Sequence, residues 1–192
     1  LKHQTHLEIE GLVSRERFRE KMFPGIRRAT FSVSTRPSET IGIGSEIEFG
    51  RSIYRTFDPE EQPYLGRMVE AALDANLKLM SRLTLGTGLA YERMKEPQGD
   101  ALAYDGWILR NRLNFQINRE ASLRVVTEYD SFDERFAFEP LLTYRLNAFS
   151  VFYLGMADQY LRPGDDAGGA GRARWAIDGR QIFAKLQYLL RV

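Results

Sequence analysis

The chain has 192 residues, enough for one domain with a sizeable core, and its 27 basic and 26 acidic residues leave a net charge of +1. This near-zero charge argues against a nucleic-acid partner, and the lack of cysteine excludes disulfides and thiolate metal sites. No run of about 18 apolar residues occurs, which excludes a transmembrane helix. A transmembrane barrel is not excluded, because its strands are short and alternate.

Apolar and polar residues alternate along most of the chain, a pattern typical of strands with one apolar face. In chain order, the alternating segments are 7–13, 29–33, 41–49, 69–79, 83–91, 107–117, 123–129 and 138–146. Residues 150–159 are apolar on both faces, and a last alternating segment covers 182–192. Many of these segments have about ten residues, the length with which a tilted strand crosses a bilayer. The sequence therefore predicts about ten strands.

Residues 63–80 also fit a helix. Leu65, Met68, Val69, Ala72 and Leu73 recur at helical spacing, and alanine, leucine and methionine favour helices. The alternation from 69 to 79 continues the series of strands on both sides of it. A strand is therefore the prediction for this segment.

The expected connections differ in length. Short turns are predicted at 36–39, 80–82, 118–120 and 147–149, and longer polar segments at 14–25, 54–66, 94–103, 130–137 and 161–180. Short and long connections alternate, as they do in outer-membrane barrels, where the tight turns are periplasmic and the long loops external. This rule places both chain ends on the periplasmic side and requires an even number of strands. No linker divides the chain, so residues 1–192 are predicted to form one barrel domain.

The C-terminal segment alternates up to the last residue, although most chain ends are polar and frayed. We predict that 182–192 closes a lipid-embedded barrel, with the strand near 150–159 on one side and the strand around 5–13 on the other. Such a tail resembles the signal that the barrel-assembly machinery of the outer membrane recognises. The predicted contributors are Leu186, Tyr188, Leu190 and Val192, chiefly Tyr188 and Val192.

Residues 108–155, "ILRNRLNFQINREASLRVVTEYDSFDERFAFEPLLTYRLNAFSVFYLG", and then "RQIFAKLQYLLRV" carry a family resemblance. They are similar to the C-terminal barrel region of large bacterial outer-membrane proteins of unknown function, which often have a family-9-like carbohydrate-binding domain upstream. The likeness is clearest over 107–192 and departs at Ala148 and Phe149, where the family usually has a Pro-Gly turn. It implies that the chain is the last part of a larger protein, and it supplies no catalytic residues.

The polar sides of the predicted strands carry a set of charged residues that we expect to face the barrel lumen. These are Glu46, Glu48, Glu70, Asp74, Glu92, Arg110, Arg112, Arg124, Glu128, Arg145 and Lys185. Because a barrel of about ten strands has little room beyond its side chains, opposite charges on neighbouring strands are expected to fill the interior as ion pairs. A selectivity ring for a small solute is the alternative, and acid–base work by Glu46 and Glu48 is the third possibility.

No catalytic, metal or cofactor site is predicted. The two histidines lie near the N-terminus without a matching metal set, and the glycines near Gly42 and Gly86 lack the third glycine of a dinucleotide fingerprint. The prediction is a non-enzymatic outer-membrane β-barrel, an antiparallel up-and-down sheet acting as anchor, pore or component of an envelope complex. Its partners would be outer-membrane lipid, the barrel-assembly machinery, and other envelope proteins or a carbohydrate-binding domain of the same precursor. A soluble all-β carbohydrate-binding module remains the alternative.

Overall fold

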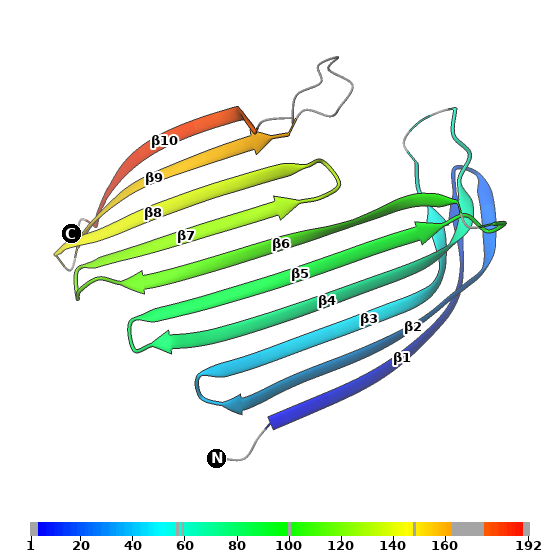
Figure 1. Ribbon diagram of the computed structural model, residues 1–192, viewed down its shortest axis with the longest axis horizontal. Helices are drawn as coiled ribbons and strands as arrows, with labels where there is room; N and C mark the ends of the chain where they lie inside the picture. Colours follow the sequence, from blue (N-terminus) through cyan, green and yellow to red (C-terminus); the bar gives the residue numbers. More distant parts are fainter. Residues whose placement is uncertain are drawn as a thin grey trace. The chain divides into compact units, whose positions relative to one another are not determined.

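The computed structural model describes residues 4–56, 58, 60–99, 101–147, 149–162 and 175–189. These residues form ten β-strands (Figure 1): β1 Gln4–Phe18, β2 Lys21–Ser38, β3 Ile41–Tyr54, β4 Tyr64–Met80, β5 Leu83–Lys95, β6 Leu102–Gln116, β7 Ala121–Asp130, β8 Arg135–Asn147, β9 Ser150–Leu161 and β10 Ala176–Tyr188. Among them there is no helix long and apolar enough to cross a membrane.

The strands form one sheet in which each strand pairs with its neighbours in sequence, in the order β1 to β10. The register is antiparallel for the first two strand pairs and for every pair from β6 to β10. The predicted fold class, an all-β, antiparallel up-and-down arrangement, is confirmed. The order ends with β1 at one edge and β10 at the other, so the predicted pairing of these two strands is not formed by the described residues.

The chain divides into two compact units, which we describe separately. Unit 1 consists of Leu1–Asp74 and Leu89–Trp107, and unit 2 of Ala75–Gly88 and Ile108–Val192. In unit 1, a small core forms where Phe23, Ile26 and Ile53 are buried together, with Phe18 and Leu65 packed against them. Buried apolar side chains in the described part of unit 2 include Ala121 and Val126. Few of the described side chains of the strands are therefore fully buried.

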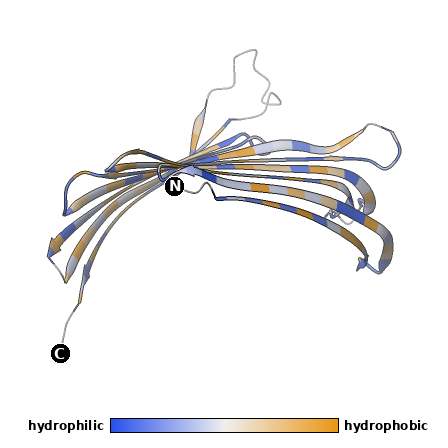
Figure 2. Ribbon diagram, turned by 90° about the horizontal axis from the view of Figure 1, so that it is seen from below, coloured by the Kyte–Doolittle hydropathy of each residue, from blue (hydrophilic) through white to orange (hydrophobic). Residues whose placement is uncertain are grey.

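The segment with both helical and strand character is a strand. Residues 64–80 form β4, as predicted from the alternation of 69–79 with its polar neighbours. The helical propensity of its alanines and leucines is outweighed by pairing within the sheet, because tertiary context regularly overrides a weak local preference. Hydrophobic and hydrophilic residues alternate along the ribbons of the sheet (Figure 2).

Three of the predicted long connections differ from the structure. The segment 14–25 was expected to be a loop, but β1 and β2 continue through it and are joined only by Arg19 and Glu20. Both residues have positive φ, 46° and 63°, as in the tight turn that suits the twist of a hairpin. Gly25 (φ 88°) is the extra residue of a bulge, where the register passes from Ser14–Ile26 to Arg15–Pro24.

The second correction concerns the end of the segment 161–180, where β10 begins at Ala176 and includes five residues that were expected to be loop. The connection between β7 and β8 is also short, at residues 131–134. At the start of β10 and at the facing ends of β7 and β8, pairing with the adjacent strand continues beyond the residues whose alternation predicted a strand. The expectation that short and long connections alternate without exception therefore fails, although 55–63 and 96–101 are longer than the turns 39–40 and 81–82.

Candidate functional site

The register shows which residues share a face of the sheet, because directly paired residues of neighbouring strands point to the same side. In unit 1, Ile9 pairs with Phe31, and Phe31 pairs with Ile47. In unit 2, Leu142 pairs with both Leu123 and Leu154. Both units therefore have an apolar face. Side chains on these faces are exposed to solvent. In unit 1, Leu7 is 72% exposed and Ile9 74%, and in unit 2, Ile182 is 67% exposed and Leu186 64%.

Aromatic residues form two rows on the apolar face of unit 2. Near the connection 131–134, Phe136 pairs with Tyr129 and Tyr160. The ring of Trp175 lies edge-on to Tyr129 and Phe136, with centroids 6.1 and 6.5 Å apart. Toward the short turns, Tyr144 pairs with Phe152. Eight residues separate Tyr144 from Phe136 along β8, which corresponds to about 27 Å along the strand and about 20 Å across a bilayer at a tilt of about 40°.

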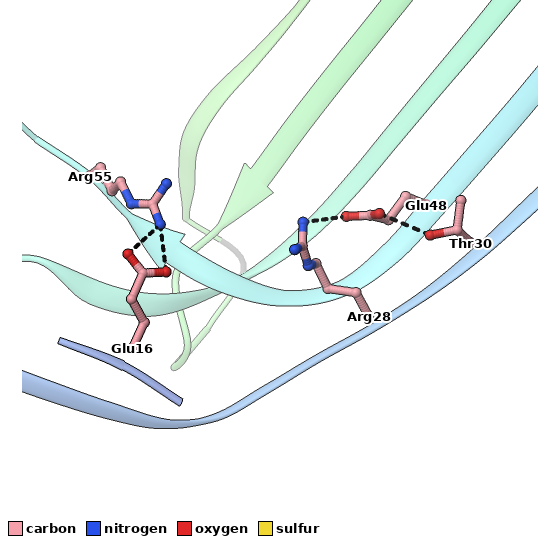
Figure 3. Close-up of polar contacts among 5 residues, drawn as sticks. All are labelled: Glu16, Arg28, Thr30, Glu48 and Arg55. Atoms are coloured by element: carbon pink, nitrogen blue, oxygen red, sulfur yellow. Dashed lines mark hydrogen bonds and ion pairs between the residues drawn. The ribbon is translucent and has the colours of Figure 1, made fainter. Parts of the chain in front are cut away.

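The predicted lumen-facing carboxylates of unit 1 lie on the opposite, polar face. Glu46 pairs with Ser32 and Glu48 with Thr30, and the Cβ of Asp74 lies near Gly44. Arg28 donates a hydrogen bond of 2.9 Å to Glu48, and Thr30 donates a second one, also of 2.9 Å, to the same carboxylate (Figure 3).

Glu70 of β4 is surrounded mainly by charges of its own sign. It interacts electrostatically with Glu92, Glu48 and Glu46, and with Arg28 as the opposite charge. All of these residues belong to unit 1. Among the described residues, the electrostatic neighbours of Glu70 are thus three carboxylates and one guanidinium, which makes this part of the polar face acidic.

The predicted lumen-facing cations lie on the polar face of unit 2. Arg110 pairs with Glu128 and donates a hydrogen bond of 3.1 Å to it, and Arg124 follows on the same face opposite Asn114. Further along the sheet, Arg145 pairs with Val151, and Lys185 pairs with Tyr153. Among the described residues, no ion-pair partner lies within 4 Å of Arg112, Arg124, Arg145 or Lys185.

Within the described part of each unit, one ion pair that involves the predicted residues is formed. Of the eleven predicted residues, Glu48 pairs with Arg28, and Arg110 pairs with Glu128. Arg112 and Arg124 stand opposite uncharged residues of a neighbouring strand. The register is the reason, because it places Arg112 opposite Val126 and Arg124 opposite Leu141.

The structure also shows an ion pair that sequence reasoning missed. Asp158 is 1% exposed and accepts hydrogen bonds from Arg180 Nε at 2.9 Å and Arg180 Nη2 at 2.7 Å, and a third from the Tyr160 hydroxyl at 2.9 Å. Asp158 shares the apolar face with Phe138, its partner in β8. Asp158 follows Leu154 and Met156 at intervals of two residues, so the alternation along β9 could have placed it on the apolar face. Arg180, by contrast, was expected to lie in a loop.

A series of side-chain hydrogen bonds crosses the same apolar face. The Thr87 hydroxyl donates to Asn111 Oδ1 over 2.7 Å, and Asn111 Nδ2 donates to the Thr127 hydroxyl over 3.4 Å. Thr127 pairs with Phe138, and Phe138 pairs with Asp158, so these hydrogen bonds and the Asp158–Arg180 ion pair lie in one row of the sheet. Each polar group in this row has a partner within the protein, which lowers the cost of keeping it on an apolar surface.

Polar contacts in unit 1 also fasten the connection 55–63. Arg55 Nη2 lies 2.7 Å from both carboxylate oxygens of Glu16 (Figure 3). The Tyr54 hydroxyl donates to Glu61 over 3.2 Å. Arg19 reaches the carbonyl oxygens of Asp58 and Glu61 at 2.8 and 3.3 Å. The turn between β1 and β2 is thus tied to this connection.

In the described part of the chain, no group of three or more metal-ligating side chains is brought together. His6 lies on β1, exposed, with Nε2 at 3.4 Å from Glu8. Of the predicted assembly signal, Leu186 and Tyr188 lie on the apolar face of β10, paired with Phe152 and Ser150. Leu190 and Val192 lie outside the described residues.

No family model matches the chain, and no curated protein matches it. Among solved structures, the chain is similar to one described as "KdgM porin in complex with disordered oligogalacturonate". The two share 10% sequence identity with a TM-score of 0.39, and the match covers 98% of each chain. At this identity and TM-score, the likeness lends no argument about the family of this chain or about what it binds.

Proposed function

We propose that this chain is the membrane-embedded β-barrel of an outer-membrane protein, with its apolar face toward lipid and its polar face toward the interior. The observation that carries the proposal is the uncovered apolar face, which includes Leu7, Ile9, Ile182 and Leu186, each more than 60% exposed. A soluble protein rarely leaves so continuous an apolar surface open to water. Lipid is the partner whose chemistry matches it.

The aromatic rows support the same orientation. Outer-membrane barrels carry an apolar band about 25 Å tall between girdles of aromatic residues. The row of Tyr129, Phe136 and Tyr160 and the row of Tyr144 and Phe152 enclose a band of similar height in unit 2. In this orientation the turns 39–40, 81–82 and 117–120 are periplasmic, and so are both chain ends.

The runner-up is a soluble carbohydrate-binding module with a sandwich fold. A sandwich needs two sheets whose apolar faces pack against each other. The described strands instead follow one another in a single sheet order, which favours the membrane proposal.

The two edge strands need partners if the sheet lies in a membrane, since each unpaired backbone group in hydrocarbon costs several kcal/mol. The simplest partners for β1 and β10 are each other, which would close a barrel of ten strands. Strands from an upstream part of a longer protein are the alternative. The barrel-assembly machinery, and other envelope proteins or a carbohydrate-binding domain of the same precursor, remain proposed partners.

The role we propose is that of a non-enzymatic anchor or pore. The polar face of unit 2 carries several charges without an ion-pair partner among the described residues, such as Arg112, Arg124 and Lys185. Charges of this kind are stable only in contact with water or counter-ions. A hydrated interior, as in a pore, would supply both.

Expression with export to the periplasm of a Gram-negative host tests the proposal. We expect the chain in the outer-membrane fraction, requiring detergent for extraction and migrating differently in gels before and after heating. Deletion of Tyr188–Val192 should abolish insertion, because it removes ladder bonds from the last strand together with the proposed assembly signal. A chain that is monomeric in buffer without detergent would contradict the membrane assignment.

Cysteine pairs test closure, since the chain has no cysteine of its own. A pair at Phe152 and Leu186, which are direct partners in β9 and β10, is the positive control. A panel that combines Leu186→Cys with single cysteines along the apolar face of β1 should cross-link at one position if ten strands close. Cross-linking of the control alone would show that the barrel includes strands from elsewhere.

A further inference from the structure

A cavity of about 350 Å³ lies on the polar face of unit 2, beside the turn 81–82 and the adjacent ends of β5, β6 and β7. Its lining combines two guanidinium groups, Arg82 and Arg124, with the polar side chains of Thr84, Asn114 and Ser122. Asn114 and Arg124 are direct partners in the ladder, so both point to the polar side. The described residues that line this cavity include no carboxylate.

The hydrogen bonds around the cavity leave donors free. Asn114 Nδ2 donates to the Thr84 hydroxyl over 3.3 Å, and a hydroxyl that accepts still has its own hydrogen to donate. Arg82 Nη1 donates to the carbonyl of Ile117 over 3.3 Å, which holds the guanidinium near the turn and leaves its other N–H groups available. Ser122 adds a further hydroxyl. The cavity is therefore rich in donors and carries two positive charges.

Arg124 is the central group of this site, because no ion-pair partner lies within 4 Å of it among the described residues. A guanidinium presents a planar fork of donors that matches the two oxygens of a carboxylate or phosphate. We propose that the cavity binds a small solute through a carboxylate or phosphate group, with Arg124 and Arg82 as the charged contacts and Thr84 as a neutral donor.

This inference goes beyond the proposed function, because the site needs only the turn 81–82 and three consecutive strands of unit 2. Under that function, the cavity would lie at the periplasmic end of the polar face. A cavity of this volume is at the lower end of the range for small-molecule sites. General attraction of anions to exposed arginines is the alternative, and Arg112 provides the comparison. It lies two residues from Asn114 on the same face of β6, outside the cavity lining.

The test is calorimetric titration of the detergent-solubilised full chain with sodium phosphate and, separately, sodium acetate, at constant ionic strength set with sodium chloride. We expect saturable binding of at least one of the two anions. Arg124→Gln should weaken it by about tenfold or more, since a bidentate charged contact is lost. Arg112→Gln should change the affinity for the anion by less than about twofold, because the added sodium chloride largely screens long-range attraction.

Two outcomes would overturn the proposal: no saturable binding of either anion, or equal weakening by both arginine variants. If Arg124→Gln does not fold, Thr84→Val is the substitute, with an expected weakening of about threefold from the lost neutral donor. Heat-dependent migration of the same samples reports on the barrel separately. Binding by a chain that does not insert into membranes would leave this site standing and reject the proposed function.

Discussion

The polar faces of the two units differ in the sign of their charge. The five predicted carboxylates, Glu46, Glu48, Glu70, Asp74 and Glu92, all lie in unit 1. The five predicted cations, Arg110, Arg112, Arg124, Arg145 and Lys185, all lie in unit 2, together with Glu128. A net charge of +1 for the whole chain conceals this separation. It shows that charge balance across a sequence does not imply neutralisation between neighbouring strands.

The separation has an energetic consequence within each unit. Charges that stand beside charges of the same sign raise the free energy of the folded state, unless water or counter-ions screen them. Two ion pairs of the polar face also differ: Arg28–Glu48 is the less exposed, with side chains 34% and 18% exposed against 55% and 37% for Arg110–Glu128. Substitutions on the apolar face, on the polar face and among the carboxylates around Glu70 should therefore change the free energy of unfolding by different amounts.

The largest predicted effect is the loss of stability when a charge is placed on the lipid-facing side of the sheet. This substitution tests the assignment of faces on which the comparison of polar faces depends. Leu142 and Thr143 are neighbours in β8 that point to opposite faces. Leu142→Arg should destabilise the chain in lipid vesicles by about 2–4 kcal/mol, and Thr143→Arg should have a mild effect, since only the first places a charge in hydrocarbon. Urea unfolding in vesicles measures both. Equal sensitivity at the two positions would reject the assignment of faces.

A smaller effect is expected from breaking the less exposed ion pair of the acidic region. Glu48→Ala removes the acceptor of hydrogen bonds from Arg28 and Thr30, and Arg28 Nε already has no partner. We expect a loss of about 1–3 kcal/mol in the free energy of unfolding. Glu46→Ala is the matched control, two residues away on the same face and without an ion pair. A larger loss for Glu46→Ala than for Glu48→Ala would contradict this account.

The smallest predicted effect is a gain in stability from a substitution of Glu70. Glu70 interacts with Glu92, Glu48 and Glu46, so Glu70→Gln removes repulsion while keeping the shape of the side chain. We expect the free energy of unfolding to rise by a few tenths of a kcal/mol, about the size of a single exposed charge interaction. The gain should disappear at high salt, where repulsion is screened. A clear loss of stability would show that Glu70 has a favourable partner in the folded chain.

Much of the fold was predictable because the alternation of side chains is a local property. A period of two identifies strands and their apolar face from the residues alone, and it correctly assigned 69–79 to a strand against a competing helical pattern. It also placed Leu73 and Leu142 on the opposite side from Glu70 and Arg145. These assignments need no knowledge of which strand lies beside which.

The ends of the strands were less predictable. Residues 14–25 have no clear alternation of apolar and polar side chains, and Arg19 and Glu20 lack the usual glycine or asparagine of a tight turn. Pairing between β1 and β2 forms the hairpin there despite this, with Gly25 taking up the extra residue at the bulge. The start of β10 was missed for a related reason, since Ala176 to Arg180 follow a segment rich in glycine and aspartate.

The sequence alone thus determined the fold class, the apolar face and the side on which Arg124, Glu48 and Lys185 stand, because each follows from the spacing of residues within one strand. The tertiary structure alone decided which charges meet. Register places Arg110 opposite Glu128 but Arg112 opposite Val126, and it brings Arg180 to the buried carboxylate of Asp158. Register depends on turns and bulges between strands, and a shift of one residue moves every side chain to the other face. No single strand carries that information.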